Sequence, residues 1–199
     1  MKKDIPIYEL FIDPEDESIV NMVSLVDKPA TEKTFQVFNE QKELKFNINE
    51  DKQELLGIAM VPDMKIYRRD ESGNEYNVFF SKETIRQIAQ TFFKNNLSNN
   101  VNLAHTDILA NSFIFQSFIV DSDKGITYPD AVDGSWIIGV KVVDDNVWKD
   151  VLDGKFRGYS VEGLFKYESN QVKQDKATTD EDLMTLLKKF NSMYTKPVF

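Results

Sequence analysis

Short apolar runs rich in β-branched and aromatic residues recur along the chain, and turn-forming residues separate them. Runs of about four to eight such residues bounded by turn signals are typical of strands rather than of helices. A chain built from many short strands has to pack its sheets against one another or against a few helices. The predicted strands lie at 5–12, 19–26, 55–62, 65–70, 75–80, 101–108, 113–120, 134–143 and 155–167.

Helical periodicity is confined to three segments. After Ser81, a favourable N-cap, apolar residues at 85, 88, 89 and 92 form one face of a helix. The run Asp144-Asp-Asn146 can cap a short helix that ends at Gly154. A last helix is predicted from about Thr179, after a polar linker. We therefore predict an α+β, mainly β fold, a mostly antiparallel barrel or sandwich with peripheral helices. One domain would span 1–167, with the polar linker and C-terminal helix in 168–199.

Composition excludes several classes of function. Among 199 residues, 24 Lys+Arg against 33 Asp+Glu give a net charge of −9, which argues against nucleic-acid and anionic-membrane partners. No run reaches the roughly 18 apolar residues of a membrane span, and no secretory signal is recognisable, so we expect a soluble intracellular protein. The absence of cysteine excludes thiol nucleophiles and Cys-ligated metals, and a single histidine excludes poly-histidine metal sites.

That histidine, His105, is the first candidate for chemistry. If its segment is a strand, Leu103, His105 and Asp107 share a face, because side chains alternate along a strand. A carboxylate beside an imidazole fixes its tautomer and stabilises its protonated form, as a general base requires. The alternative is a hydrogen-bonded or solvent-facing histidine with no catalytic role.

The second candidate is Ser160, within Gly158-Tyr-Ser-Val-Glu-Gly163. Flanking glycines leave room for a substrate and for the backbone N–H donors that stabilise an oxyanion. The spacing is not that of the G-x-S-x-G nucleophile elbow, so a serine on a glycine-kinked strand is the alternative interpretation. Glu162 shares a strand face with Ser160, and Asp121 ends the strand predicted at 113–120. No phosphate-binding glycine motif or EF-hand pattern is present.

The order of these segments resembles that of the phage prohead serine proteases of the XkdF type, capsid-maturation enzymes related to the herpesvirus assemblins. The resemblance covers roughly residues 18–167. Its most specific part is the block from Gly134 through VKVVDDNVW and the turn at 153–155 to GYSVEG, and VDKPA at 26–30 adds support. It implies an assemblin-like antiparallel β-barrel surrounded by helices.

The resemblance also implies roles for residues and partners. Ser160 would be the nucleophile and His105 its general base, with no cofactor and no metal. The second histidine of the assemblins is missing here, so a third member would be Asp107, Glu162 or Asp121, in that order. The implied substrates are scaffold protein, the N-terminal segment of the major capsid protein, and the enzyme itself, inside the procapsid in the host cytoplasm.

Two further matters stay open at this stage. The portal protein and a second copy of the chain remain candidate partners. The rival interpretation is a catalytically silent head protein that keeps a protease fold for assembly, since a fold does not guarantee its site.

Overall fold

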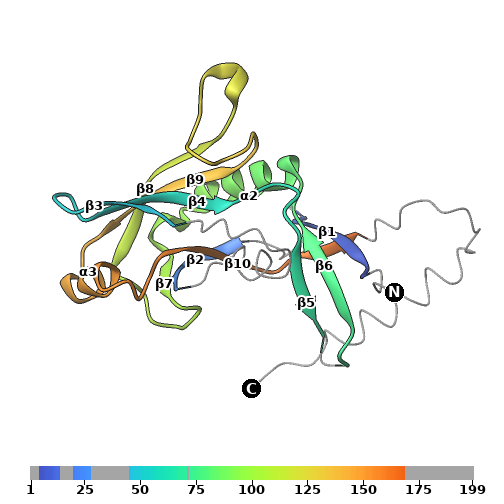
Figure 1. Ribbon diagram of the computed structural model, residues 1–199, viewed down its shortest axis with the longest axis horizontal. Coiled ribbons are helices and arrows are strands. Elements are labelled where there is room, and N and C mark those ends of the chain that lie inside the picture. Colours follow the sequence, from blue (N-terminus) through green and yellow to red (C-terminus); the bar gives the residue numbers. More distant parts are fainter. Residues whose placement is uncertain (1–4, 14–19, 28–44, 71, 169–199) are drawn as a thin grey trace, which may run out of the picture.

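The computed structural model describes residues 5–13, 20–27, 45–70 and 72–168 (Figure 1). This part of the chain is mostly β, and its strands form one antiparallel and two mixed sheets. The strands are β1 (Ile7–Phe11), β2 (Val20–Val26), β3 (Asn47–Asn49), β4 (Glu54–Met60), β5 (Ile66–Arg69), β6 (Glu75–Phe79), β7 (Val101–Leu103), β8 (Ser112–Ile119), β9 (Trp136–Val142), β10 (Gly158–Gly163) and β11 (Lys166–Glu168). The helices are α2 (Lys82–Lys94), α3 (Asp145–Leu152) and the short 3₁₀ helices η1 (Leu97–Asn99) and η2 (Ser122–Lys124).

The antiparallel sheet has the order β3-β4-β9-β8 and supplies much of the core. Its strand β9 is buried along almost its whole length, which explains its nearly continuous apolar sequence. Helix α2 packs its apolar stripe on this sheet, and the rings of Phe92 and Trp136 meet edge to face with centroids 5.8 Å apart. The apolar residues predicted at 85, 88, 89 and 92 to form one face of this helix are all buried, so the predicted face is confirmed.

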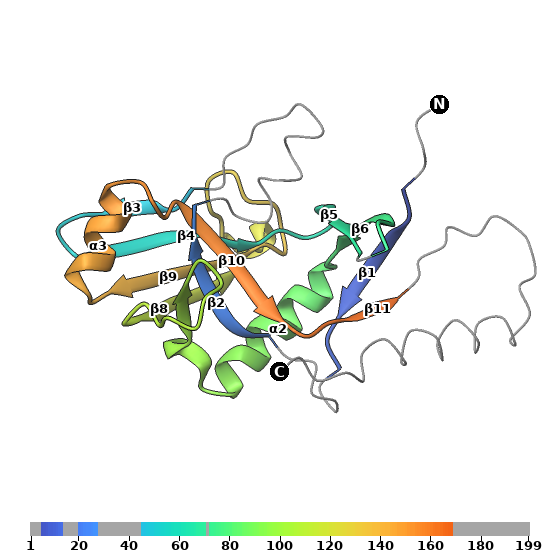
Figure 2. The same cartoon turned by 90° about the horizontal axis from the view of Figure 1, so that it is seen from below.

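A small mixed sheet, β10-β2-β7, crosses the antiparallel sheet and packs on it (Figure 2). Tyr159 of β10 contacts the ring of Phe46 and donates a hydrogen bond from its hydroxyl to the carbonyl of Leu55, at 2.9 Å. Gly57 permits this approach, because a Cβ there would lie 2.9 Å from the Cβ of Phe46. The small sheet is therefore held firmly against the core.

The third sheet has the order β11-β1-β6-β5. The predicted strands at 65–70 and 75–80 correspond to β5 and β6, which pair as an antiparallel hairpin. The predicted strands at 5–12 and 19–26 correspond to β1 and β2, and these two strands do not pair with each other. Strand β1 pairs with β6 and β11, whereas β2 pairs with β7 and β10, so the two segments belong to different sheets.

Both predicted helix caps are confirmed. The Ser81 hydroxyl accepts a hydrogen bond from the Thr84 amide, and the Asp144 carboxylate accepts from the amides of Asn146 and Val147. These bonds satisfy amides that have no partner within the helix.

A closed, assemblin-like barrel is not found among the described strands, because β10 and β7 end their sheet instead of continuing into a ring. Within the described residues, no helix is long and apolar enough to cross a membrane. The linker and final helix predicted in 168–199 fall, apart from Glu168 in β11, outside the described residues.

Candidate active site

Strand β2 is the central strand of the small sheet, and its register brings four polar side chains to one face. Ser24 lies opposite Ser160 of β10 on one side and opposite Asn102 of β7 on the other. Glu162 is two residues beyond Ser160 and therefore points to the same face. Residues far apart in the sequence thus meet because three strands pair in this register.

His105 reaches this face from a tight turn after β7. The prediction of a strand over 101–108 is wrong beyond Leu103, since residues 104–107 form turns and bends. Ala104 and His105 both adopt left-handed backbone conformations, with φ of 50° and 60°. Such conformations are costly for residues other than glycine and occur often at functional sites. Consequently, His105 and Asp107 do not share a strand face.

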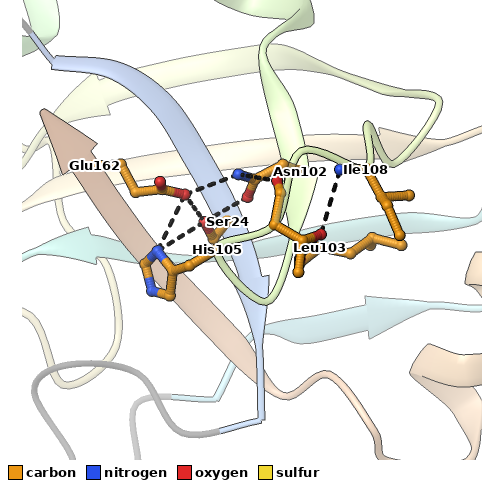
Figure 3. Close-up of polar contacts among 7 residues, drawn as sticks. Ser24, Asn102, Leu103, His105, Ile108 and Glu162 are labelled. Atoms are coloured by element: carbon orange, nitrogen blue, oxygen red, sulfur yellow. Dashed lines mark hydrogen bonds and ion pairs between the residues drawn. The ribbon is translucent and has the colours of Figure 1, made fainter. Parts of the chain in front are cut away.

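The imidazole of His105 contacts two of the polar residues (Figure 3). Its Nδ1 lies 3.0 Å from Oε1 of Glu162 and 3.2 Å from Oγ of Ser24. The side chain of His105 is 46% exposed and that of Glu162 31%, whereas Ser24 is fully buried. His105 and Glu162 therefore lie at the surface, next to the buried hydroxyl of Ser24. Ser24 and Asn102 form a buried polar layer beneath this pair.

Asn102 connects this pair to the turn. Its Nδ2 donates to Oε1 of Glu162 and to the backbone carbonyl of Thr106, both at 2.9 Å. Its Oδ1 lies 2.5 Å from Oγ of Ser24, which also contacts Oε1 of Glu162. A hydroxyl has one proton, so Ser24 donates to Asn102 or to Glu162 at any moment.

These contacts set the charge of Glu162. Burial alone would raise the pKa of its carboxyl group, because desolvation disfavours the charged form. Hydrogen bonds from Ser24 and Asn102 and the positive charge of His105 outweigh desolvation and hold the pKa below its usual value. Glu162 is therefore a carboxylate at neutral pH.

An ionised Glu162 fixes the tautomer of the neutral imidazole. The carboxylate oxygen can only accept, so the imidazole places its hydrogen on Nδ1 and donates it to Glu162. The lone pair then lies on Nε2, the nitrogen that a general base uses. A carboxylate that orients a histidine through Nδ1 is the arrangement that supports a serine nucleophile in Ser–His–acid sites.

The structure brings some of the predicted site residues together and not others. Ser160 is 5% exposed and lies beside Ser24, but no hydrogen bond joins it to His105. Asp107 is exposed and makes no ion pair with His105 among the described residues. Asp121 binds Lys124 at the start of η2. Of the three predicted acids, Glu162 is the one in contact with the imidazole.

Two members of the polar layer were missed by sequence reasoning. Ser24 interrupts an apolar run, and Asn102 lies between the apolar residues Val101 and Leu103. Both are therefore polar residues inside buried strands. A polar residue inside such a run is informative, since it must find a partner. No cluster of three or more potential metal ligands occurs in the part of the chain that the structure describes.

Comparison with known proteins identifies the family of the chain. Neither the curated proteins nor the solved structures that were searched gave a match. A family model described as "Putative phage serine protease XkdF" matches residues 43–168, well over half of the chain. The match includes His105, Ser160 and Glu162, and it supports a protease role in phage maturation. The chain therefore belongs to the phage serine protease family of the XkdF type.

Proposed function

We propose that the protein is a serine endopeptidase of phage head maturation, in which Ser160 is the nucleophile and His105 the general base. The observation that carries the proposal is the contact between His105 Nδ1 and Glu162 Oε1, 3.0 Å long. It orients the imidazole and leaves Nε2 available for the serine. The family match over residues 43–168 supplies the class of reaction.

The proposed reaction runs through an acyl-enzyme. Nε2 of His105 takes the proton of the Ser160 hydroxyl while Oγ attacks the scissile carbonyl carbon. Glu162 stabilises the imidazolium that forms, and backbone N–H groups of the glycine-flanked strand stabilise the oxyanion. The imidazolium then donates its proton to the leaving amine, and water hydrolyses the ester. The step requires Ser160 Oγ within about 2.6–3.2 Å of Nε2, a distance that substrate binding often establishes.

Ser160 is favoured over Ser24 as the nucleophile. Ser24 is fully buried and contacts Asn102, His105 and Glu162, so a peptide carbonyl cannot reach it without disrupting these contacts. Ser160 lies two residues after Gly158 on β10, which is an edge strand of its sheet. Its oxygen is therefore the one that a substrate lying along this edge can approach.

The proposed substrates are scaffold protein, N-terminal segments of the major capsid protein, and the enzyme itself, cleaved inside the procapsid in the host cytoplasm. The portal protein and a second copy of the chain are further proposed partners. These proposals rest on the family to which the chain belongs.

A second candidate function is a catalytically silent head protein. The low exposure of Ser160 and the absence of a hydrogen bond from it to His105 favour this alternative. It predicts that head assembly depends on the fold but not on either side chain.

Co-expression with the capsid and scaffold proteins of the same phage tests the two functions. We expect Ser160→Ala and His105→Ala each to reduce processing on the order of 10⁶-fold, which means to background. Labelling by a fluorophosphonate should likewise occur in the wild type and disappear in Ser160→Ala.

The matched control is Ser135→Ala, which removes a fully buried serine hydroxyl that has no hydrogen-bond partner among the described residues. This variant should process substrate at the wild-type rate. Wild-type processing by Ser160→Ala would refute the proposed mechanism. Normal heads without any processing in the wild type would establish the silent alternative.

A further inference from the structure

The side-chain amide of Asn102 connects Glu162 to the turn that carries His105. From β7 it donates one hydrogen bond to the Glu162 carboxylate on β10 and another to the carbonyl of Thr106, one residue after His105. Its oxygen faces Ser24 of β2. One side chain thus links all three strands of the sheet to the turn that carries the imidazole.

The turn needs such a link because its backbone is held in an unfavourable conformation. Ala104 and His105 both have left-handed backbone conformations, which are unfavourable for residues other than glycine. The Ala104 amide donates to the carbonyl of Leu25, and the hydroxyl of Thr106 donates to the carbonyl of Leu103. These bonds anchor both ends of the turn, and Asn102 anchors it to the carboxylate itself.

We propose that Asn102, supported by the Ser24 hydroxyl, is a positioning residue that holds Glu162 and His105 in register for proton transfer. Asn102 touches no reacting atom. Its two N–H donors fix the distance between a carboxylate on one element and an imidazole on another. When the Ser24 hydroxyl donates to the amide oxygen, it favours the orientation in which both amide hydrogens face acceptors.

This inference deepens the proposed function and rests on it for the reaction, but its geometric content can be measured alone. The chain has a single histidine, so every imidazole signal in a nitrogen-15 histidine NMR spectrum belongs to His105. The tautomer of His105 reports its contact with Glu162 directly. A general loss of packing that spares this contact would not change it.

The primary experiment records that spectrum for full-length wild type, Asn102→Ala and Asn102→Asp. We expect the Nδ1–H tautomer in the wild type and a shift towards the Nε2–H tautomer in Asn102→Ala. In Asn102→Asp, an oxygen replaces the nitrogen that faces Glu162, so two carboxylates oppose each other and the contact is weakened further. The fluorophosphonate labelling rate of Ser160 should fall about 10- to 100-fold in both variants, as expected for small displacements of reacting groups.

Matched controls separate positioning from stability. Asn77→Ala removes a buried amide side chain from β6, in a different sheet, and should change neither the tautomer nor the labelling rate. Ser24→Ala removes only the hydroxyl that supports Asn102, so it should disturb the contact between Glu162 and His105 less than Asn102→Ala does. If Asn102→Ala does not fold, as judged by circular dichroism, Ser24→Ala should still show the tautomer shift and a smaller loss of rate.

The outcomes are distinguishable. A folded Asn102 variant, or Ser24→Ala in its place, that keeps both the wild-type tautomer and the wild-type labelling rate would overturn the inference. A tautomer shift in a protein whose Ser160 never reacts, even in the wild type, would reject the proposed protease function while keeping Asn102 as the residue that positions the pair.

Discussion

One face of the β10-β2-β7 sheet presents Val23, Leu25 and Tyr159, whereas the other presents Ser24, Ser160 and Glu162. The first face packs into the main core, where Val23 and Leu25 are fully buried. The second face carries a hydrogen-bonded layer that ends at His105. The same strands therefore contribute to stability through one face and to chemistry through the other.

The difference shows why the candidate site is precise although His105 lies on a turn. Apolar packing on one face fixes the strand positions, and the fixed strands hold the polar side chains in register on the other. Sites on strands are placed more precisely than sites on loops, and here the strand residues Asn102 and Glu162 constrain the loop residue. Substitutions on the two faces should accordingly differ in which measurement they change.

The largest effect on the polar face, short of removing Ser160 or His105, is expected from Glu162→Gln. An amide keeps the shape but removes the charge that stabilises the imidazolium and allows the wrong tautomer. We expect a loss of kcat/KM on the order of 10⁴-fold at neutral pH, together with a small loss in the free energy of unfolding, measured by cleavage kinetics and urea denaturation. Asp107→Asn is the control, and a larger loss in that variant would assign the third member to Asp107 instead.

On the apolar face, Leu25→Ala should act on stability. Removing a fully buried leucine side chain leaves a cavity and should lower the free energy of unfolding by roughly 2–5 kcal/mol. The rate per folded molecule should stay at the wild-type value. Leu164→Ala, at a leucine that is 67% exposed, should change stability by less than about 0.5 kcal/mol. A loss of rate without loss of stability in Leu25→Ala would contradict the division between the faces.

Two buried serines provide a smaller test. Ser24 has hydrogen-bonding partners on both neighbouring strands, whereas Ser135 Oγ has none among the described residues. Ser24→Ala should lower the free energy of unfolding by about 1–3 kcal/mol, because Asn102 Oδ1 loses its donor. Ser135→Ala should stay within about 0.5 kcal/mol of the wild type in the same thermal and urea unfolding measurements. Equal effects in the two variants would show that the polar layer adds nothing to stability.

The smallest effect concerns pH. The pKa of Glu162 is lower in the folded protein than in the unfolded chain, because hydrogen bonds from Ser24 and Asn102 and the charge of His105 stabilise the carboxylate against desolvation. Its ionised form therefore stabilises the fold above the unfolded pKa, and this contribution disappears as the pH falls through the folded pKa. Urea unfolding between about pH 6 and pH 3 should show the wild type losing its advantage over Glu162→Gln. A constant difference between the two proteins across this range would refute the linkage.

Local signals were sufficient for most elements but not for their pairing. The apolar runs located β4, β8 and β9, and the capping residues Ser81 and Asp144 located the starts of α2 and α3. The partners of β1 and β2 were not predictable, because pairing across sheets depends on packing rather than on neighbouring residues. The absence of a closed barrel among the described strands has the same origin.

The sequence by itself determined which residues could do chemistry here: one histidine, no thiol, and a glycine-flanked serine with a carboxylate two residues later. Tertiary structure alone decided which of them meet. A turn with two left-handed residues carries His105 to Glu162 and away from a shared strand face with Asp107. The register of β2 brings in Ser24, and β7 brings in Asn102. Hydrogen bonds act over about 3 Å, so they depend on the three-dimensional register of the strands and not on distance along the chain.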